Sequence, residues 1–173
     1  NGAKVILAED KPRFGGSLLT DDASIGNETA KEWSNKIISE LKLMKNVIIK
    51  NRSQVFGYYD HNMLVMSERV SDHLPKSNKY EPKQRLWYIR AKEVVISSGS
   101  IERPLVFGNN DTPGVMLSSA AKEYLKVYGV LVGKKPLIFT NNDSGYETAI
   151  EFKKNGVEPT ILDTRKETSR NYK

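Results

Sequence analysis

The chain has 173 residues, a net charge of +6 and no cysteine. This length suits one domain or slightly more, and the lack of cysteine excludes a disulfide scaffold or a thiolate metal site and fits a reducing cytoplasm. The lysines are scattered, which favours solvated loops over a nucleic-acid interface, and no apolar run reaches the ~20 residues of a membrane span.

The first residues predict a strand of a parallel sheet. Asn1 and Gly2 are typical of a helix end, and residues 3–8 predict a buried parallel strand that ends at Glu9. A chain that opens at a helix end is expected to be a piece of a longer protein, with a strand and a glycine turn upstream. The alternative is that residues 5–8 form the true first strand.

The next elements predict a helix followed by an antiparallel insertion. Asn27 is expected to cap a helix that runs to about residue 45, with apolar side chains on one face. Two β-rich runs follow in residues 46–60. Residues 63–70 and 84–91 predict antiparallel strands joined by a polar loop, and residues 92–99 form a further apolar run. We interpret this as a β-meander inserted between parallel strands.

The last third of the chain predicts a βαβ unit. A loop over residues 100–117 leads to a helix with a cap at Ser118 and a stop at Gly129. A strand at 135–140, a helix at about 146–154 and a strand at 159–163 follow. We therefore expect two partial nucleotide-type domains, residues 1–108 and 109–173.

Glu9 is the leading candidate for a ligand-binding residue. A carboxylate at the carboxyl end of a parallel strand can accept hydrogen bonds from both hydroxyls of an adenosine ribose, and its charge favours NAD or FAD over NADP. Asp10 is the adjacent competitor, and a plain surface acid is the alternative. Arg13 could meet a phosphate, and Gly15 and Gly16 would allow close backbone approach or merely a tight turn.

The second βαβ turn departs from the phosphate-binding pattern. Only Gly145 remains of its glycines, and Asp143 would repel a pyrophosphate at the helix start. At the end of the 92–99 run, the Ser-Ser-Gly sequence either lets the backbone approach a cofactor closely or simply ends the strand in a turn. His61 and His73 are expected in solvent, and neither a metal site nor a catalytic pair is identifiable.

One long stretch carries a family resemblance. Residues 101–149 contain Glu-Arg-Pro, Asn-Asp-Thr-Pro-Gly-Val-Met-Leu, a tyrosine-containing helix and Thr-Asn-Asn-Asp, in that order. This resembles the α subunit of heterotetrameric sarcosine oxidase, and the Ala-Glu-Asp-Lys-Pro-Arg-Phe-Gly-Gly segment fits the same family. The resemblance covers essentially the whole chain and extends to the related α subunits of amine and proline dehydrogenases.

The resemblance implies an α/β, two-dinucleotide-binding-domain flavoprotein fold that is similar to disulfide reductases and incomplete here. It implies NAD in this region, with FAD, FMN and tetrahydrofolate elsewhere in a complex with β, γ and δ subunits. It further implies oxidative demethylation of sarcosine to glycine, with release of H2O2 and transfer of the one-carbon unit to tetrahydrofolate. A folate-binding domain would lie downstream.

The resemblance also implies cofactor-binding positions. Glu9 matches the ribose acid, and the following loop matches the segment against the dinucleotide; the strand position Val55 matches a backbone contact to adenine. Ser98 and Gly99 replace the usual Thr-Gly. The positions carried over are Glu9, Arg13, Gly15, Gly16, Ser17, Val55, Ser98 and Gly99. None matches a sarcosine-oxidising residue.

Two interpretations follow from the sequence. In the first, the chain is a fragment of an oxidoreductase, inactive alone and weak in binding NAD without the upstream glycine turn. In the second, it is a degenerate nucleotide fold that serves assembly. The lack of cysteine argues against a disulfide reductase, because that class needs a redox-active cysteine pair, unless the pair lies elsewhere in a longer protein.

Overall fold

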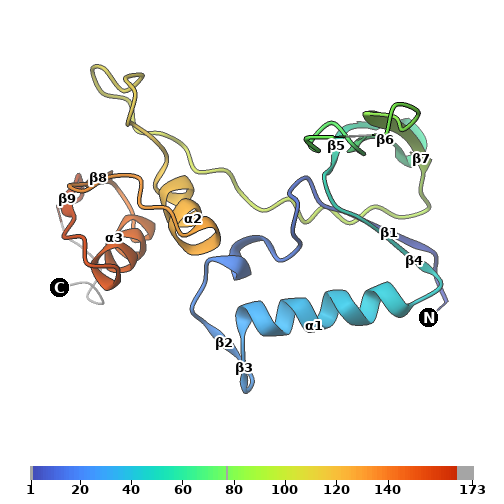
Figure 1. Ribbon diagram of the computed structural model, residues 1–173, viewed down its shortest axis with the longest axis horizontal. Helices are drawn as coiled ribbons and strands as arrows, with labels where there is room; N and C mark the ends of the chain where they lie inside the picture. The colour runs from blue at the N-terminus through green and yellow to red at the C-terminus, as the bar shows by residue number, and fades with distance from the viewer. Residues whose placement is uncertain (1, 77, 167–173) are drawn as a thin grey trace. The chain divides into compact units, whose positions relative to one another are not determined.

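The computed structural model describes residues 2–76 and 78–166, which divide into two compact units, Asn1–Ser97 and Ser98–Lys173 (Figure 1). Each unit contains its own parallel strand pair and its own helical layer. The assignment of two nucleotide-type domains with a boundary at residue 108 stays a prediction.

The first unit opens with a parallel pair joined through a helix. The four residues of β1 (Val5–Ala8) pair with those of β4 (Val47–Lys50), and α1 (Ala30–Leu43) supplies the crossover that a parallel pair requires (Figure 1). The predicted parallel strand is confirmed, but its burial is wrong, since Val5 and Ile6 are 45% and 40% exposed. Among the described residues only β4 pairs with β1, so much of its surface stays uncovered.

The start of α1 differs from the sequence prediction. The Thr29 hydroxyl accepts a hydrogen bond from the Glu32 backbone N–H at 3.2 Å, and the Glu32 carboxylate accepts one from the Thr29 N–H at 3.0 Å. This capping box satisfies two amide groups at the helix start. The predicted cap, Asn27, is wrong because it lies in the tight turn between β2 (Ser24–Ile25) and β3 (Glu28–Thr29).

The apolar side of α1 is partly buried, as its spacing predicts. Ala30 is fully buried at the start of the helix, and Met44 lies just past its end, 46% exposed. The half-buried apolar positions between them are Trp33, Ile37, Ile38 and Leu41.

The predicted β-meander is confirmed. β5 (Ser53–Tyr59), β6 (Met63–Arg69) and β7 (Gln84–Arg90) form an antiparallel sheet in that order. The turn between β5 and β6 is the short 3-10 helix η2 (Asp60–Asn62). Met66 of the central strand is fully buried, so the middle of this sheet has its own small core.

A half-buried carboxylate joins the meander to the parallel pair. Glu68 on β6 accepts hydrogen bonds from Lys50 at 2.8 Å, Arg85 at 3.0 Å and the Trp87 indole N–H at 2.7 Å. The Lys50 ammonium also lies 4.9 Å from the Trp87 ring centroid, a cation–π arrangement. Trp87 therefore packs within the meander and also anchors this cluster.

The apolar run 92–99 does not form the strand that its composition indicates. No strand in the described part of the chain pairs with it, and Val95 and Ile96 are 87% and 72% exposed. A strand is stabilised by a ladder of backbone hydrogen bonds to a neighbour, so an apolar run without a neighbour remains extended coil.

The second unit contains the predicted βαβ arrangement. β8 (Leu137–Thr140) and β9 (Thr160–Asp163) are parallel, and α3 (Ser144–Lys154) connects them. α2 (Ser118–Tyr128) packs against α3. Phe152 on α3 is 1% exposed at the centre of the core, which also contains Ala121, Ile138 and Ala149.

A carboxylate from outside the helix caps α2. Glu102 accepts hydrogen bonds from the backbone N–H groups of Ser118 at 3.2 Å and Ser119 at 2.7 Å. The N-cap position is Leu117, without a side-chain bond, so the predicted cap at Ser118 is wrong. The predicted stop is confirmed, because Gly129 ends the helix with φ of 67°.

Candidate functional site

Glu9 lies directly after β1 and is held by its backbone. Its N–H donates to the Lys50 carbonyl at 2.8 Å, and its carbonyl accepts from the Ser53 N–H at 2.8 Å. One carboxylate oxygen accepts from the Lys11 N–H at 3.0 Å. Glu9 is half-buried whereas Asp10 is exposed. The backbone thus fixes Glu9 at the carboxyl end of the strand pair, where ligands bind in open α/β sheets.

The surroundings of Glu9 disfavour its ionised form. Burial raises the pKa of the Glu9 carboxyl above its usual value, the bond from the Lys11 amide lowers it, and the Asp10 carboxyl raises it again. The net shift is upward. Hydroxyl donors that approach this carboxylate would stabilise the charged form and reverse the shift.

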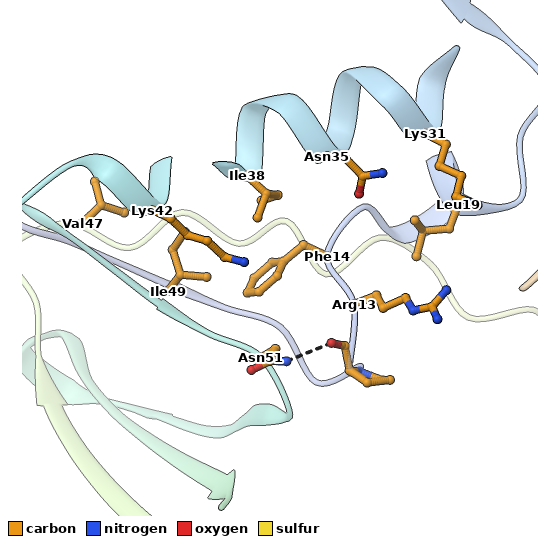
Figure 2. Close-up of a pocket in the computed structure, with 11 residues that line it drawn as sticks. Arg13, Phe14, Leu19, Lys31, Asn35, Ile38, Lys42, Val47, Ile49 and Asn51 are labelled. Carbon is orange, nitrogen blue, oxygen red and sulfur yellow. Dashed lines mark hydrogen bonds between the residues drawn. The ribbon is translucent and has the colours of Figure 1, made fainter. Parts of the chain in front are cut away.

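The turn after β4 holds the loop that carries Glu9. The Arg52 N–H donates to the Lys11 carbonyl at 3.0 Å, and the Asn51 side-chain amide donates to the Pro12 carbonyl at 2.8 Å (Figure 2). Arg52 has φ of 50°, an uncommon conformation for a residue with a side chain. The Ser53 side chain, which is 1% exposed, donates to the Asn51 carbonyl at 2.9 Å.

Sequence reasoning missed Asn51, Arg52 and Ser53. The parallel register pairs Ala8 with Lys50, which places the residues that follow the two strands side by side. A polar run directly after the second strand was the available signal. It carries this meaning only once the register of the two strands is known.

The glycine pair follows the Glu9 loop and has two different environments. Gly15 has φ of 125°, and a Cβ placed there would lie 2.8 Å from the Ser34 hydroxyl and 3.0 Å from Leu19. Gly16 has φ of 51° and open space around it. Gly15 is therefore required by packing on α1, whereas Gly16 leaves its surface free for a ligand.

Other predicted positions of the first unit surround this loop. Arg13 and Ser17 are exposed, the latter in the 3-10 helix η1 (Gly16–Leu19). Val55 is 42% exposed on β5, two residues beyond Ser53, which bonds to Glu9. The structure thus gathers Glu9, Arg13, Gly15, Gly16, Ser17 and Val55 within one unit.

The remaining predicted positions, Ser98 and Gly99, belong to the second unit. Both are exposed in a stretch without helix or strand, and Gly99 has φ of 67°. A positive φ favours glycine at this point.

The turn of the βαβ unit in the second unit is closed by its own side chains. The Thr140 hydroxyl bonds the Asn142 carbonyl at 2.9 Å, and Arg165 bonds Asp143 at 2.9 Å and Asp163 at 2.7 Å. The hydrogen bonds and charge of Arg165 hold the pKa of Asp163 well below its usual range. A Cβ at Gly145 would meet Thr140 at 2.7 Å. Gly145 thus serves close packing of helix on strand.

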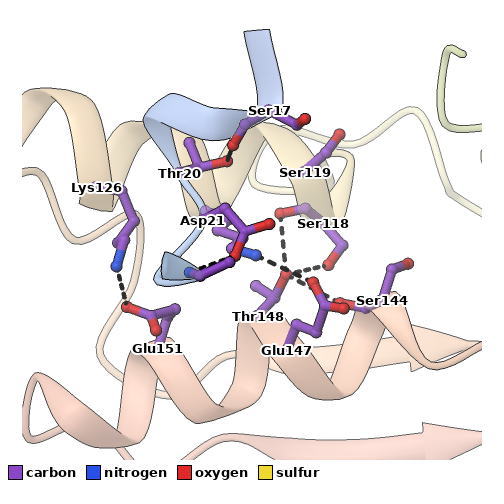
Figure 3. A network of polar contacts seen from close by, with 12 residues as sticks. Ser17, Thr20, Asp21, Ser118, Ser119, Lys126, Ser144, Glu147, Thr148 and Glu151 are labelled. Atoms are coloured by element: carbon purple, nitrogen blue, oxygen red, sulfur yellow. Dashed lines mark hydrogen bonds and ion pairs between the residues drawn. The ribbon is translucent and has the colours of Figure 1, made fainter. Parts of the chain in front are cut away.

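Polar contacts also join α2 to α3 (Figure 3). The Ser118 hydroxyl donates to the Thr148 hydroxyl at 2.8 Å, and Thr148 is 2% exposed. Lys122 pairs with Glu147 at 3.1 Å and Lys126 with Glu151 at 3.2 Å. These pairs link two helices and leave no nucleophile beside a base.

Other site chemistries find no support in residues 2–76 and 78–166. No group of three or more His, Asp or Glu side chains there could hold a metal ion, and no helix of that part is long and apolar enough to cross a bilayer. His61 is exposed, as predicted. His73 is half-buried, 3.7 Å from Asp72, and the prediction of a solvent-exposed side chain is wrong for it.

The solved structure of L-proline dehydrogenase from P. horikoshii shares this fold. It matches with a TM-score of 0.72 at 22% identity, over 98% of this chain and 32% of that chain. At this level of identity the match shows the fold alone. The predicted fold class, an α/β arrangement with parallel pairs, a β-meander and a second Rossmann-like βαβ unit, is confirmed.

Sequence comparison gives closer relatives. Sarcosine oxidase subunit alpha from Rhizobium meliloti (strain 1021) is 42% identical over 173 aligned positions, which cover 99% of this chain and 18% of that protein. The same subunit from Corynebacterium sp. (strain U-96) is 35% identical over 98% of this chain and 18% of that protein. No protein-family model matches the chain. The chain is therefore homologous, along nearly its whole length, to one region of the sarcosine oxidase α subunits, as its motifs predict.

Proposed function

We propose that this chain is the dinucleotide-binding region of an α subunit in a sarcosine-oxidising complex, and that the dinucleotide is NAD. The observation that carries the proposal is Glu9, a half-buried carboxylate fixed by backbone hydrogen bonds at the carboxyl end of the β1–β4 pair. A carboxylate there can accept both ribose hydroxyls and repels a 2′-phosphate, which favours NAD over NADP.

The loop after Glu9 fits the rest of a dinucleotide. Arg13 is exposed, and no described residue pairs with its side chain, so it is available to a phosphate. Gly16 and Ser17 add an exposed backbone surface without a steric barrier at Gly16. Val55 on the neighbouring strand β5 would lie against the adenine. The cofactor contacts at Ser98 and Gly99, which belong to the second unit, stay predictions from the sequence alone.

The role of the larger protein follows from its relatives as a proposal. The chain spans 18% of the length of the Rhizobium meliloti subunit. We place the oxidation of sarcosine, with FAD, FMN and tetrahydrofolate, outside this chain, and expect the region itself to be catalytically silent. The subunits called β, γ and δ are its proposed partners.

The test is mass spectrometry of small molecules released from the whole subunit, purified with its partners and then denatured. NAD in a one-to-one ratio supports the proposal, whereas the absence of NAD, with or without FAD from elsewhere in the complex, would contradict it. Glu9→Gln should reduce the released NAD at least tenfold, because it loses the charge that the ribose hydroxyls require. Asp10→Asn is the matched control and should leave the NAD content unchanged.

A second candidate function is assembly without a cofactor in the second unit. The Arg165–Asp143 and Arg165–Asp163 pairs favour it, because they occupy the turn where a pyrophosphate would otherwise bind. If this second function is right, the α subunit of a related amine or proline dehydrogenase would have the same turn between β8 and α3, closed by ion pairs. Unchanged cofactor content in Arg165→Ala would support it, and loss of NAD would contradict it.

A further inference from the structure

A basic groove lies along α1 in the first unit. It has a volume of about 510 Å³ and is formed by α1, β4 and the loop after Glu9 (Figure 2). Half-buried apolar side chains, among them Phe14, Ile38 and Ile49, line its floor, and exposed Lys31, Lys42 and Arg13 stand at its rim. No acidic side chain lines it.

Several other cations on strands and helices of this chain are neutralised by a carboxylate. Lys36, Lys50 and Lys122 each pair with a carboxylate at 2.8 to 3.1 Å. By contrast, no carboxylate in the described residues pairs with Lys31, Lys42 or Arg13. A concave surface lined by unneutralised charge of one sign concentrates the field and attracts the opposite charge.

The spacing of the rim defines the size of the occupant. Lys31 and Lys42 are eleven residues apart, which places them on the same side of α1 and about 16 Å apart along its axis. This distance is longer than a single phosphate group, and it matches the length of about five residues of extended chain. Asn35 and Ile38 lie between them on the groove side.

We propose that this groove binds an extended, acidic segment of a partner subunit, with an apolar side chain inserted over Phe14 and Ile38. The apolar floor would supply buried area and the basic rim would set orientation and specificity. Complementary charges across an interface steer the encounter of separate chains and fix their register, and the basic rim is complementary to an acidic segment of a partner subunit. The proposal rests on the proposed place of the chain in a multi-subunit complex.

The first test reverses the rim charge in the whole subunit, purified with its partners. Lys31→Glu combined with Lys42→Glu should weaken subunit association about tenfold and reduce its salt dependence. Lys45→Glu, an exposed charge outside the groove, is the matched control and should change association less than twofold. Unchanged association in the double variant overturns the proposal.

A second test needs no charge change. A photo-crosslinking amino acid at Asn35 should label an acidic peptide of another subunit, identified by mass spectrometry. Labelling of a segment of the same subunit, or of no protein, overturns the proposal. NAD content is measured in the same samples. If it persists while the groove tests fail, only the groove proposal is lost; if it is absent from unaltered complex, the proposed function is lost.

Discussion

At the scale of single residues, one carboxylate sets how the proposed site responds to pH. The pKa of Glu9 is raised above its usual value by burial and by Asp10, and only its ionised form accepts both ribose hydroxyls fully. We therefore expect NAD affinity to fall as pH decreases through this raised pKa, at a higher pH than for an ordinary glutamate. Retained NAD, measured after filtration of the complex between pH 4 and pH 8, checks this.

The same shift provides a control on stability. An acid with a raised folded-state pKa binds more protons when folded, so its ionised form destabilises the fold at neutral pH. Glu9→Gln should thus be as stable as the unaltered protein or more stable, and its low NAD content should not vary with pH. A pH profile that survives in Glu9→Gln would contradict the assignment.

The two glycines of the loop should respond differently to alanine. Gly15→Ala meets the Ser34 hydroxyl at 2.8 Å and requires a φ of 125°, whereas Gly16→Ala meets open space at a φ of 51°. We expect Gly16→Ala to cost about 1 kcal/mol and Gly15→Ala about 2 to 3 kcal/mol. Urea unfolding of both variants measures this, and equal costs would contradict the packing role of Gly15.

The position of Glu9 at a strand end was predictable from the sequence, but the hydrogen bonds that hold its loop were not. An apolar run that ends in an acid is visible in the sequence. By contrast, the hydrogen bonds from Asn51 and Arg52 to the Glu9 loop join segments about forty residues apart. They depend on the register of β1 and β4, which hydrophobic periodicity does not specify.

At the scale of elements, helix starts depend on competition between neighbouring polar residues. Asn27 and Ser118 both have side chains that can cap a helix. However, Asn27 lies in a hairpin turn, and the carboxylate of Glu102 rather than the Ser118 hydroxyl caps α2. The helices α1 to α3 and the strands of the parallel pairs and the meander were predictable from periodicity, but the short β2–β3 hairpin was not. The run 92–99 was not, since a strand requires a partner as well as an apolar composition.

The remote cap of α2 gives a prediction at this scale. Glu102→Ala removes the acceptor for two backbone N–H groups and a negative charge near the helix start, and should cost about 1 kcal/mol of unfolding free energy. Glu102→Gln keeps an acceptor and should lose less. Circular dichroism during urea unfolding measures both. Equal stability of Glu102→Ala and the unaltered protein would show that water replaces the carboxylate.

At the scale of the whole molecule, the family motifs gave more information about function than the hydrophobic periodicity did. Two units, each with a parallel pair, follow from the strand and helix patterns. Nothing in those patterns distinguishes a cofactor site from a strand-end acid. The motifs of residues 101–149 predicted the relatives instead, and one of them, Glu-Arg-Pro, contains the carboxylate that caps α2.

The last prediction concerns Glu68, which joins three segments of the first unit. Burial acts to raise its pKa, but hydrogen bonds from Lys50 and Trp87 and the charges of Lys50 and Arg85 outweigh this, so its pKa lies below the usual 4.5. An acid with a lowered folded-state pKa stabilises the fold above its unfolded pKa, and this contribution is lost as pH falls through the folded value.

Glu68→Gln should therefore lower the unfolding free energy by about 2 kcal/mol at pH 7, and the difference should shrink as pH approaches 3. Urea unfolding at both pH values measures it. Glu40→Gln, an exposed change on α1, should stay within about 0.5 kcal/mol. A difference for Glu68→Gln that persists undiminished at low pH would mean that shape and packing, rather than charge, make Glu68 the link between the parallel pair and the meander.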